Sequence, residues 1–528
     1  MDKVDNSLST RQNMGKRDVD ISWCEESSTT KYRHYPHSST DIHRCSHRNM
    51  GLFASPCLYN GARYARNADR PPFMITGMEH EAMISLETRA FVVVHRNEDV
   101  RELALKSKHV DGLDLPQALN QIAGWQIARN KLPEWADCDD IIYPPHISME
   151  QCSSQFTAQY KAEIVNRLLC TDDGADNARD SAHSDDIGKT DITGITEAEH
   201  AEEWDSVTTP AGNADLSMVD LTGGFGVDFS YLARGFTRAA YVERQPHLCD
   251  LAAHNMIVLG LHQTEIICGD GVEYLRSMQP VSLIYIDPAR RDEHGTRTYA
   301  IEDCMPNVLA LRDLLLAKAR FAIIKLSPML DWRKAIADFG GAVSEVHIVS
   351  TGNECKELLM VLDGAVETRH PTDDVRAPHV YCVNDGQRID YDSAVYARGL
   401  HIGTAPLPEM EYLYEPNASI MKAGCFDLLE ERYGVTQIGP NSHLFVAAEP
   451  VTDFPGRGFA IEAVGGMGKK DVRRLLSGVG RANVAVRNFP LTAPQLRKKL
   501  KLADGGDTYL FGTTIQGGGH ILLRTVKV

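Results

Sequence analysis

From residue 218 onward the chain alternates short apolar runs with segments of helical spacing, and this alternation restricts the possible fold more than any other feature. Apolar runs of four to eight residues that alternate with helical patterns predict βα units. Such units build a parallel sheet in which the helices are right-handed crossovers. The expected strands are residues 218–221, 239–243, 265–268, 282–286, 321–326, 343–350 and 357–362.

The last two of these runs follow each other closely, with no helical segment between them. A closing hairpin would insert one antiparallel strand into the otherwise parallel sheet. Seven strands that end in a hairpin are typical of class I methyltransferases and not of dinucleotide-dependent dehydrogenases. We therefore expect an α/β fold with a seven-stranded Rossmann-like methyltransferase sheet over residues 215–370.

A glycine cluster follows the first expected strand, where Asp220 precedes Gly223, Gly224 and Gly226. Glycines allow a sharp turn and a close approach of the backbone to a ligand. A dinucleotide site would have a third glycine where this chain has Phe229. An acidic residue before the glycines suits a cationic, amine-bearing ligand better than a phosphate, and S-adenosylmethionine is such a ligand.

Acidic residues also end the second and third expected strands. In an open parallel sheet, ligands bind at the carboxyl ends of the strands. Glu243 can accept hydrogen bonds from both hydroxyls of a ribose, and Asp270 can accept one from the amino group of an adenine. The predicted binding residues for S-adenosylmethionine are Asp220, Thr222, Gly223, Gly224, Gly226, Glu243, Asp270 and Gly271.

The fourth expected strand ends in Asp287-Pro288-Ala289-Arg290 and faces the substrate side. Asp287 could orient an amine toward the methyl group or act as a base after the transfer. Alternatively, Pro288 only shapes the loop and Arg290 pairs with a carboxylate. We take Asp287, Pro288 and Arg290 as candidate catalytic residues. The candidate substrate-binding residues, on this and two neighbouring strand ends, are Arg291, Lys325, Ser327 and Lys356.

Charge is distributed unevenly along a chain whose net charge is −17, which argues against a protein that coats nucleic acid generally. Residues 171–205 hold twelve acidic side chains and two basic ones, whereas residues 451–528 hold thirteen Lys and Arg and five acidic side chains. A basic C-terminal domain on an acidic protein indicates nucleic-acid binding there. The twelve cysteines lack any Cys-x-x-Cys pair, which favours reduced, buried thiols, for example Cys170 and Cys268, in a cytoplasmic protein.

The remaining segments complete the expected organisation. Residues 1–74 are polar and predict a disordered tail, and residues 171–214 predict an acidic flexible insertion. Residues 75–170 predict a mainly helical domain, in which residues 86–95 resemble a strand but could also form a helix fragment. Residues 371–452 are expected to form a connection and a small α/β module, and residues 453–528 a βααββ domain. No metal site, membrane span or obligate protein partner is expected.

Several stretches together resemble a bacterial family of class I S-adenosylmethionine-dependent methyltransferases with a C-terminal THUMP-like domain. They are Asp-Leu-Thr-Gly-Gly-Phe-Gly-Val-Asp (220–228), Tyr-Val-Glu (241–243), Ile-Asp-Pro-Ala-Arg-Arg (286–291), Ile-Lys-Leu-Ser-Pro-Met-Leu-Asp (324–331), Glu-Cys-Lys-Glu-Leu (354–358) and Arg-Asn-Phe-Pro (487–490). The resemblance implies that residues 150–154, with Thr157 and Lys161, lie against the cofactor pocket. It also implies a ferredoxin-like module at 412–446 and an RNA-binding role for the THUMP-like domain.

The target atom stays open at the level of sequence. The Asp-Pro-Ala-Arg motif resembles that of RNA 5-methyluridine methyltransferases, which need a catalytic cysteine where this chain has Lys325-Leu326-Ser327-Pro328. Enzymes with Asp-Pro-Pro-Tyr methylate exocyclic nitrogens, but Ala289 and Arg290 replace the second proline and the stacking ring, and Tyr299 or Trp332 would have to stack instead.

The sequence thus predicts a methyltransferase for a base in structured RNA, either tRNA or rRNA. The alternatives are a small-molecule or protein methyltransferase, and a non-catalytic RNA-binding protein on the same fold.

Overall fold

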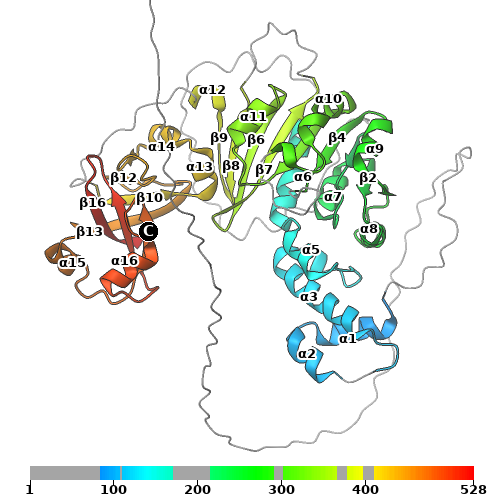
Figure 1. Ribbon diagram of the computed structural model, residues 1–528, viewed down its shortest axis with the longest axis horizontal. Helices are drawn as coiled ribbons and strands as arrows, with labels where there is room; N and C mark the ends of the chain where they lie inside the picture. The colour runs from blue at the N-terminus through cyan, green and yellow to red at the C-terminus, as the bar shows by residue number, and fades with distance from the viewer. Residues whose placement is uncertain (1–83, 108–109, 171–214, 290–300, 366–376, 397–409) are drawn as a thin grey trace, which may run out of the picture. The chain divides into compact units, whose positions relative to one another are not determined.

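The computed structural model describes residues 84–107, 110–170, 215–289, 301–365, 377–396 and 410–528 (Figure 1). Two expected segments lie outside these residues, the tail (1–74) and the acidic insertion (171–214). The same holds for Arg290, Arg291 and Tyr299.

The N-terminal part is helical, as expected. Its helices are α1 (Leu86–His95), α2 (Val100–Lys106), α3 (Leu115–Lys131), α4 (Pro133–Ala136), α5 (His146–Gln151) and α6 (Gln155–Cys170). The strand-like interpretation of residues 86–95 is wrong, because Ser85 caps a helix there by accepting a hydrogen bond from Thr88 N at 3.2 Å. Helix α1 then packs on α3.

The central sheet has nine strands, so the predicted count of seven is wrong. The strands are β1 (Ser217–Asp220), β2 (Arg238–Glu243), β3 (Thr264–Cys268), β4 (Val281–Ile286), β5 (Ala319–Leu326), β6 (Val343–Thr351), β7 (Glu354–Asp363), β8 (His379–Asn384) and β9 (Gln387–Asp392). Their order is β3-β2-β1-β4-β5-β7-β6-β8-β9. Strand β7 is antiparallel to β5 and β6, and β8 with β9 forms a further hairpin beside β6.

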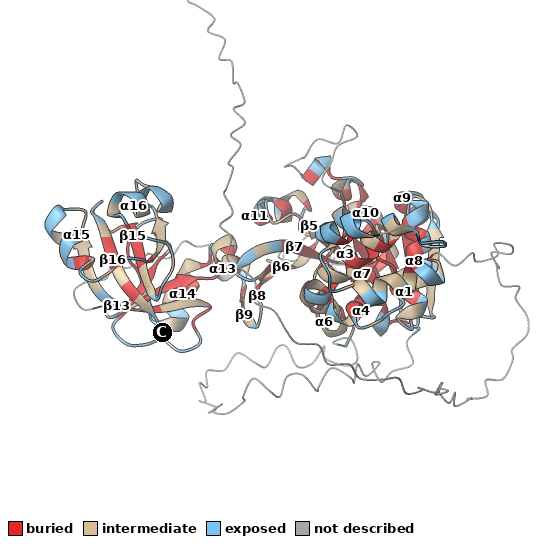
Figure 2. Ribbon diagram, turned by 90° about the horizontal axis from the view of Figure 1, so that it is seen from below, coloured by how far each residue is buried: buried red, intermediate tan, exposed pale blue. Residues whose placement is uncertain are grey.

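Helices cover both faces of this sheet. Side chains of α6, α7 (Val227–Leu232) and α8 (Pro246–Val258) share one apolar core with alternate strand residues, among them Tyr285 and Leu359. Side chains of α10 (Val308–Lys318) and α11 (Trp332–Asp338) share the other core, with Ile284 and Met360. The alternation follows from the strand, whose successive side chains point to opposite faces. In Figure 2 the buried residues, in red, are concentrated in the strands between these layers.

A second sheet occupies the C-terminal part and has seven strands in the order β11-β12-β10-β13-β16-β15-β14. Its elements are β10 (Tyr412–Pro416), α13 (Ala418–Ala423), α14 (Phe426–Tyr433), β11 (Thr436–Gln437), β12 (Phe445–Ala447), β13 (Gly456–Gly466), α15 (Lys469–Leu475), β14 (Asn483–Arg487), α16 (Ala493–Leu500), β15 (Thr508–Thr514) and β16 (His520–Lys527). The expected βααββ pattern missed β14, which joins the sheet through parallel pairing with β15.

One buried carboxylate joins distant strands of this second sheet. Glu415 on β10 is 2% exposed and pairs with Arg487 at 2.7 Å and with Arg457. Leu413 and Val446 also share a core with Phe459 and Phe511 across the sheet. Strands β10 to β12 and β13 to β16 therefore belong to one continuous sheet.

Two further sequence expectations can be compared with the structure. Cys170 and Cys268 form no disulfide, but both are exposed, so the expectation that they are buried is wrong. Within the same residues, no helix has the length and apolar character needed to cross a membrane.

Candidate active site

The glycine cluster forms a tight turn between β1 and α7. Gly224 and Gly226 have φ values of 55° and 86°, a backbone region that favours glycine. A Cβ on Gly223 would lie 2.2 Å from the ring of Tyr241, so the close packing of the turn on β2 excludes any side chain there. A Cβ on Gly224 would meet only Thr222 O, at 3.7 Å, so the turn is tightly packed at Gly223 and less so at Gly224.

Glu243, at the end of β2, points back to this turn. Its Oε2 accepts a hydrogen bond from Gly224 N at 2.9 Å, and its Oε1 accepts one from Gln245 N at 2.9 Å. The predicted ribose acceptor therefore lies beside the glycine turn.

Asp270 and Gly271 begin α9 (Gly271–Ser277) next to the same turn. Asp270 Oδ1 accepts hydrogen bonds from Val272 N and Glu273 N and caps the helix, and Asp270 Oδ2 lies 4.0 Å from Arg244. A Cβ on Gly271 would lie 2.1 Å from Leu221 O. The helix can approach the end of β1 only because this residue is glycine.

Asp220 ends β1 at the point where the strand order reverses, since β2 lies on one side of β1 and β4 on the other. Its side chain is 1% exposed and accepts a hydrogen bond from Thr222 N at 2.9 Å. Burial raises the pKa of this carboxyl group to about 8, and nearby Asp228 and Asp287 act in the same direction.

Thr222 connects the ends of β1 and β4. Its hydroxyl oxygen accepts a hydrogen bond from Asp287 N at 2.7 Å, so it holds the backbone that carries the candidate catalytic residue. The Asp287 side chain is 41% exposed, whereas Pro288 is buried. Asp287 thus opens toward a ligand at the edge of the sheet, and Pro288 supports the loop.

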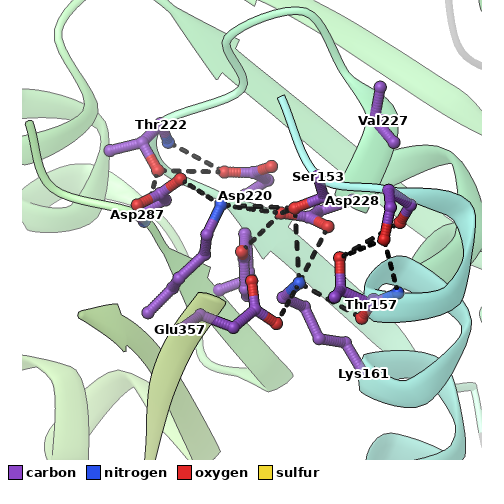
Figure 3. Close-up of polar contacts among 12 residues, drawn as sticks. Ser153, Thr157, Lys161, Asp220, Thr222, Val227, Asp228, Asp287 and Glu357 are labelled. Carbon is purple, nitrogen blue, oxygen red and sulfur yellow. Dashed lines mark hydrogen bonds and ion pairs between the residues drawn. The ribbon is translucent and has the colours of Figure 1, made fainter. Parts of the chain in front are cut away.

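A charged cluster lies behind Asp287 and is centred on Asp228, the second residue of α7 (Figure 3). Ser153 Oγ and Tyr285 OH donate hydrogen bonds to Asp228 Oδ2 at 2.8 and 2.7 Å. Lys161 Nζ lies 3.1 Å from Asp228 Oδ1, and Lys325 Nζ lies 3.4 Å from Asp228 Oδ2. A buried carboxylate with two cationic partners and two hydroxyl donors is fully compensated.

The two lysines extend the cluster in opposite directions. Lys325 on β5 lies 2.7 Å from Asp287 Oδ2, and Lys161 on α6 lies 2.7 Å from Glu357 Oε1 on β7. Charges therefore alternate in sign along the order Asp287, Lys325, Asp228, Lys161 and Glu357. Only Asp287, at one end, is well exposed, because Lys161 and Glu357 are 0% and 3% exposed.

The pKa values of the cluster reflect this alternation. Burial would raise the pKa of Asp228, but Lys161 and Lys325 outweigh it and hold the pKa well below its usual range. Burial would lower the pKa of Lys325, but Asp287 and Asp228 outweigh it and raise that pKa. For Glu357 burial prevails over Lys161 and raises the pKa. Lys325 is therefore a permanent ammonium group at neutral pH.

Glu357 faces the cluster because it lies on the same face of β7 as Leu359, and a β-bulge explains why Lys356 does not pair across the strands. Val349 pairs with Glu357, but the next residue, Ser350, pairs with Cys355, so Lys356 is the extra residue of β7. Lys356 is exposed and pairs with Glu354 at 2.7 Å. Of the candidate substrate-binding residues within the described chain, Lys325 is in the cluster, and Ser327 accepts a hydrogen bond from Met329 N in the loop that follows.

The sequence alone assigns no separate role to Asp228, and it includes Glu357 only within the stretch 354–358. Ser153 and Lys161 are placed near the cofactor only by the family resemblance. One signal could have found Lys161, since it occupies the buried face of α6 between Thr157 and Ile164. Trp332, suggested as a stacking ring, is 3% exposed and lies in the apolar core, so it offers no ring surface to a base.

Comparisons with known proteins agree with this architecture. Residues 412–455 match a ferredoxin-like domain model, and residues 456–527 match a THUMP domain-like model. A crystal structure from Porphyromonas gingivalis W83, of a protein itself only inferred to be a methyltransferase, is 28% identical. The alignment covers 84% of this chain and 98% of that one, with a TM-score of 0.66. No curated protein sequence matches the chain significantly.

Shorter similarities involve other methyltransferases. A SAM-dependent methyltransferase from Agrobacterium tumefaciens is 17% identical over 29% of this chain and 57% of its own, with a TM-score of 0.24. An inferred methyltransferase from Streptococcus mutans, in complex with SAH, is 12% identical over 28% of this chain and 88% of its own, with a TM-score of 0.23. At these scores the two similarities add nothing to the fold assignment.

The resemblance inferred from the sequence motifs is therefore confirmed. The chain combines a methyltransferase-like α/β sheet with a ferredoxin-like domain and a THUMP-like domain.

A first prediction concerns Gly271. Gly271→Ala forces the backbone of α9 away from Leu221 and should destabilise the protein by about 1–3 kcal/mol, as overpacking does. It should also weaken cofactor binding, as measured by calorimetry. Gly269→Ala is the matched control, because a Cβ on Gly269 would meet nothing within 4 Å. Equal effects of the two substitutions would contradict the close approach described here.

A second prediction concerns the pH dependence of stability. Because the folded pKa of Asp220 is raised to about 8, the folded protein holds a proton that the unfolded chain releases near pH 4. The free energy of unfolding should therefore fall as pH rises from 4 to 8, by up to about 1.4 kcal/mol for each pH unit.

Asp220→Asn removes this titration. Thermal melting between pH 6 and 8 should show the wild-type protein losing stability relative to the variant. Parallel melting curves for the two proteins would rule out a proton held on Asp220.

Proposed function

We propose that this protein is an S-adenosylmethionine-dependent methyltransferase that acts on structured RNA, with tRNA and rRNA as the candidate substrates. The observation that carries the proposal is the convergence of Glu243, Asp220 and the turn at Gly224 beside Asp287. These contacts support the proposal, because the residues proposed to accept hydrogen bonds from a ribose and from a cationic amine lie at the switch point of the sheet together with one exposed carboxylate.

The residues present fit the cofactor. Glu243 would accept hydrogen bonds from the ribose hydroxyls, and Asp270, with Gly271 giving room, would face the adenine. Thr222, Gly223 and Gly226 would shape the floor under the amino acid part, beside Asp220. When bound, the cofactor supplies an activated methyl group. The chain's own contribution is to position the acceptor of that group against Asp287.

Basic helices of the THUMP-like domain support the RNA part of the proposal. Helices α15 and α16 pack on the same face of the second sheet, because Leu475 and Leu496 share one core with Leu510 and Leu522. Their outward side chains include exposed Lys469, Lys470, Arg473, Arg474, Lys498 and Lys499. Cations gathered on one face suit the phosphate backbone of a nucleic acid.

A cytoplasmic location is part of the same proposal, since structured RNA substrates are found there. Arg290 and Arg291, which lie outside the described residues, stay in the proposal as a catalytic and a substrate-binding residue. The proposal includes neither a membrane nor an obligate protein partner.

Cofactor binding provides a third prediction. Glu243→Ala should raise the dissociation constant for S-adenosylmethionine by about 10- to 100-fold, because it removes a charged acceptor of two hydrogen bonds. Isothermal titration calorimetry measures the change. Glu265→Ala, an exposed carboxylate on the neighbouring strand β3, is the control and should bind normally. Undetectable binding to the wild-type protein would refute the enzyme assignment.

RNA binding provides a fourth prediction. Charge reversal of Lys498 and Lys499 together should lower the affinity for bulk tRNA or rRNA at least about 10-fold. The number of ions released on binding, measured from the dependence of affinity on salt concentration, should fall by roughly two. Reversal of Lys106 and Lys334, exposed lysines of other helices, is the control. Equal losses in both double variants would mean that RNA binding is not located on α16. Point substitutions are preferable to truncation of the C-terminal domain. Truncation would remove β13, which pairs directly with β10, and would therefore disrupt the rest of the sheet.

A further inference from the structure

We propose that the group methylated is a hydroxyl, the ribose 2′-hydroxyl of RNA, and not an amine or a carbon of a base. This inference rests on the proposed function and specifies its target. The observation behind it is the placement of an ammonium group, Lys325, at 2.7 Å from the exposed carboxylate of Asp287, with a second lysine–carboxylate pair behind them.

An amine and a hydroxyl, as acceptors of the methyl group, need opposite charges at the position of Lys325. An amine that attacks a methyl group becomes positively charged before it loses a proton, and an adjacent ammonium group opposes that charge. A hydroxyl must lose its proton, and negative charge develops on its oxygen as the proton leaves. An ammonium group aimed at that oxygen stabilises the developing charge, and a carboxylate beside it receives the proton.

Lys325 and Asp287 supply these two groups at the open end of the cluster. The side chain of Lys325 is 16% exposed and that of Asp287 is 41% exposed, so both are accessible from the edge of the sheet. Lys325 keeps its proton, since Asp287 and Asp228 raise its pKa, and it therefore acts as a donor. The proton acceptor is then Asp287.

The buried part of the cluster holds this pair in position. Asp228 Oδ2 lies 3.4 Å from Lys325 Nζ and is itself held by Ser153 and Tyr285. Lys161, between Asp228 and Glu357, offsets the charge of both carboxylates. Lys161 and Glu357 are therefore positioning residues, because neither is exposed enough to meet a substrate.

The side chains of Asp287 and Lys325 and the proposed cofactor account for every bond, electron pair and proton in the reaction. A bond forms between the 2′-oxygen and the methyl carbon while the bond from that carbon to sulfur breaks. The electron pair of the broken bond stays on sulfur, which changes from a sulfonium to a neutral thioether. The hydroxyl proton moves to the carboxylate of Asp287 and from there to water.

Among the described residues, this site lacks the features that the other acceptors require. Methylation of a pyrimidine carbon needs a thiolate. The cysteine next to the cluster, Cys152, donates its thiol to Met149 O, and burial raises its pKa. Methylation of a base amine needs a ring surface for the base, but Ala289 has none and Trp332 is buried. A ribose hydroxyl needs neither feature.

The test uses the full-length protein, S-adenosylmethionine carrying a labelled methyl group, and total RNA from a strain that lacks the gene. Labelled RNA is hydrolysed with alkali, which requires a free 2′-hydroxyl at each phosphodiester bond. We expect the label in alkali-stable dinucleotides. Label in mononucleotides would overturn the hydroxyl target and leave the RNA methyltransferase assignment intact. No label in any RNA, despite cofactor binding, would overturn both.

Substitution at Lys325 separates its role in transfer from a role in folding. Lys325→Met should lower the rate of label incorporation at least about 100-fold, the typical effect of removing a transition-state donor, while the dissociation constant for S-adenosylmethionine stays within about 3-fold. Lys325→Arg, which keeps the charge, should recover part of the rate. Lys334→Met is the matched control at an exposed lysine. Equal rates for Lys325→Met and the control would contradict the assigned role.

Discussion

The ion pair between Lys161 and Asp228 determines how the candidate site is assembled. Its two side chains come from α6, before the first strand, and from α7, after the glycine turn. Both are buried, and removing one partner of such a pair costs about 3–5 kcal/mol because a charge is left uncompensated. The helical N-terminal part is therefore bound to the ends of β1, β5 and β7 through one charged cluster, and the site is incomplete without α6.

Much of the site could be predicted from the sequence, because a parallel sheet brings the carboxyl ends of its strands together. Asp220, Glu243, Asp270 and Asp287 each follow an apolar run, so their common location needs only the strand order. The glycine turn was also recognisable, since Gly224 and Gly226 adopt positive φ values that other residues avoid. These predictions depend on local sequence patterns and not on contacts between distant segments.

The residues that were missed depend on packing between distant segments. Lys161 lies on a helix face that looks apolar apart from this one cation, and Glu357 reaches the cluster from the face of β7 that also carries Leu359. Strand β14 has only five residues and joins the sheet through its pairing with β15. In these cases the deciding interaction lies outside the local sequence. At residues 86–95 the deciding interaction is local, because Ser85 caps a helix whose β-branched residues also suit a strand.

The charge of the cluster also bears on how a methyl transfer would proceed to completion. With Asp220 protonated near neutral pH, Asp228, Asp287 and Glu357 face two ammonium groups, Lys161 and Lys325. When all three carboxylates are ionised, the cluster has one negative charge in excess, which favours a sulfonium at the adjacent site. In the proposed reaction, transfer would remove the positive charge from sulfur, and the released proton would neutralise Asp287. The electrostatic attraction for a sulfonium would then be lost in the step that forms the product, and a neutral thioether would be released more easily than the sulfonium that entered.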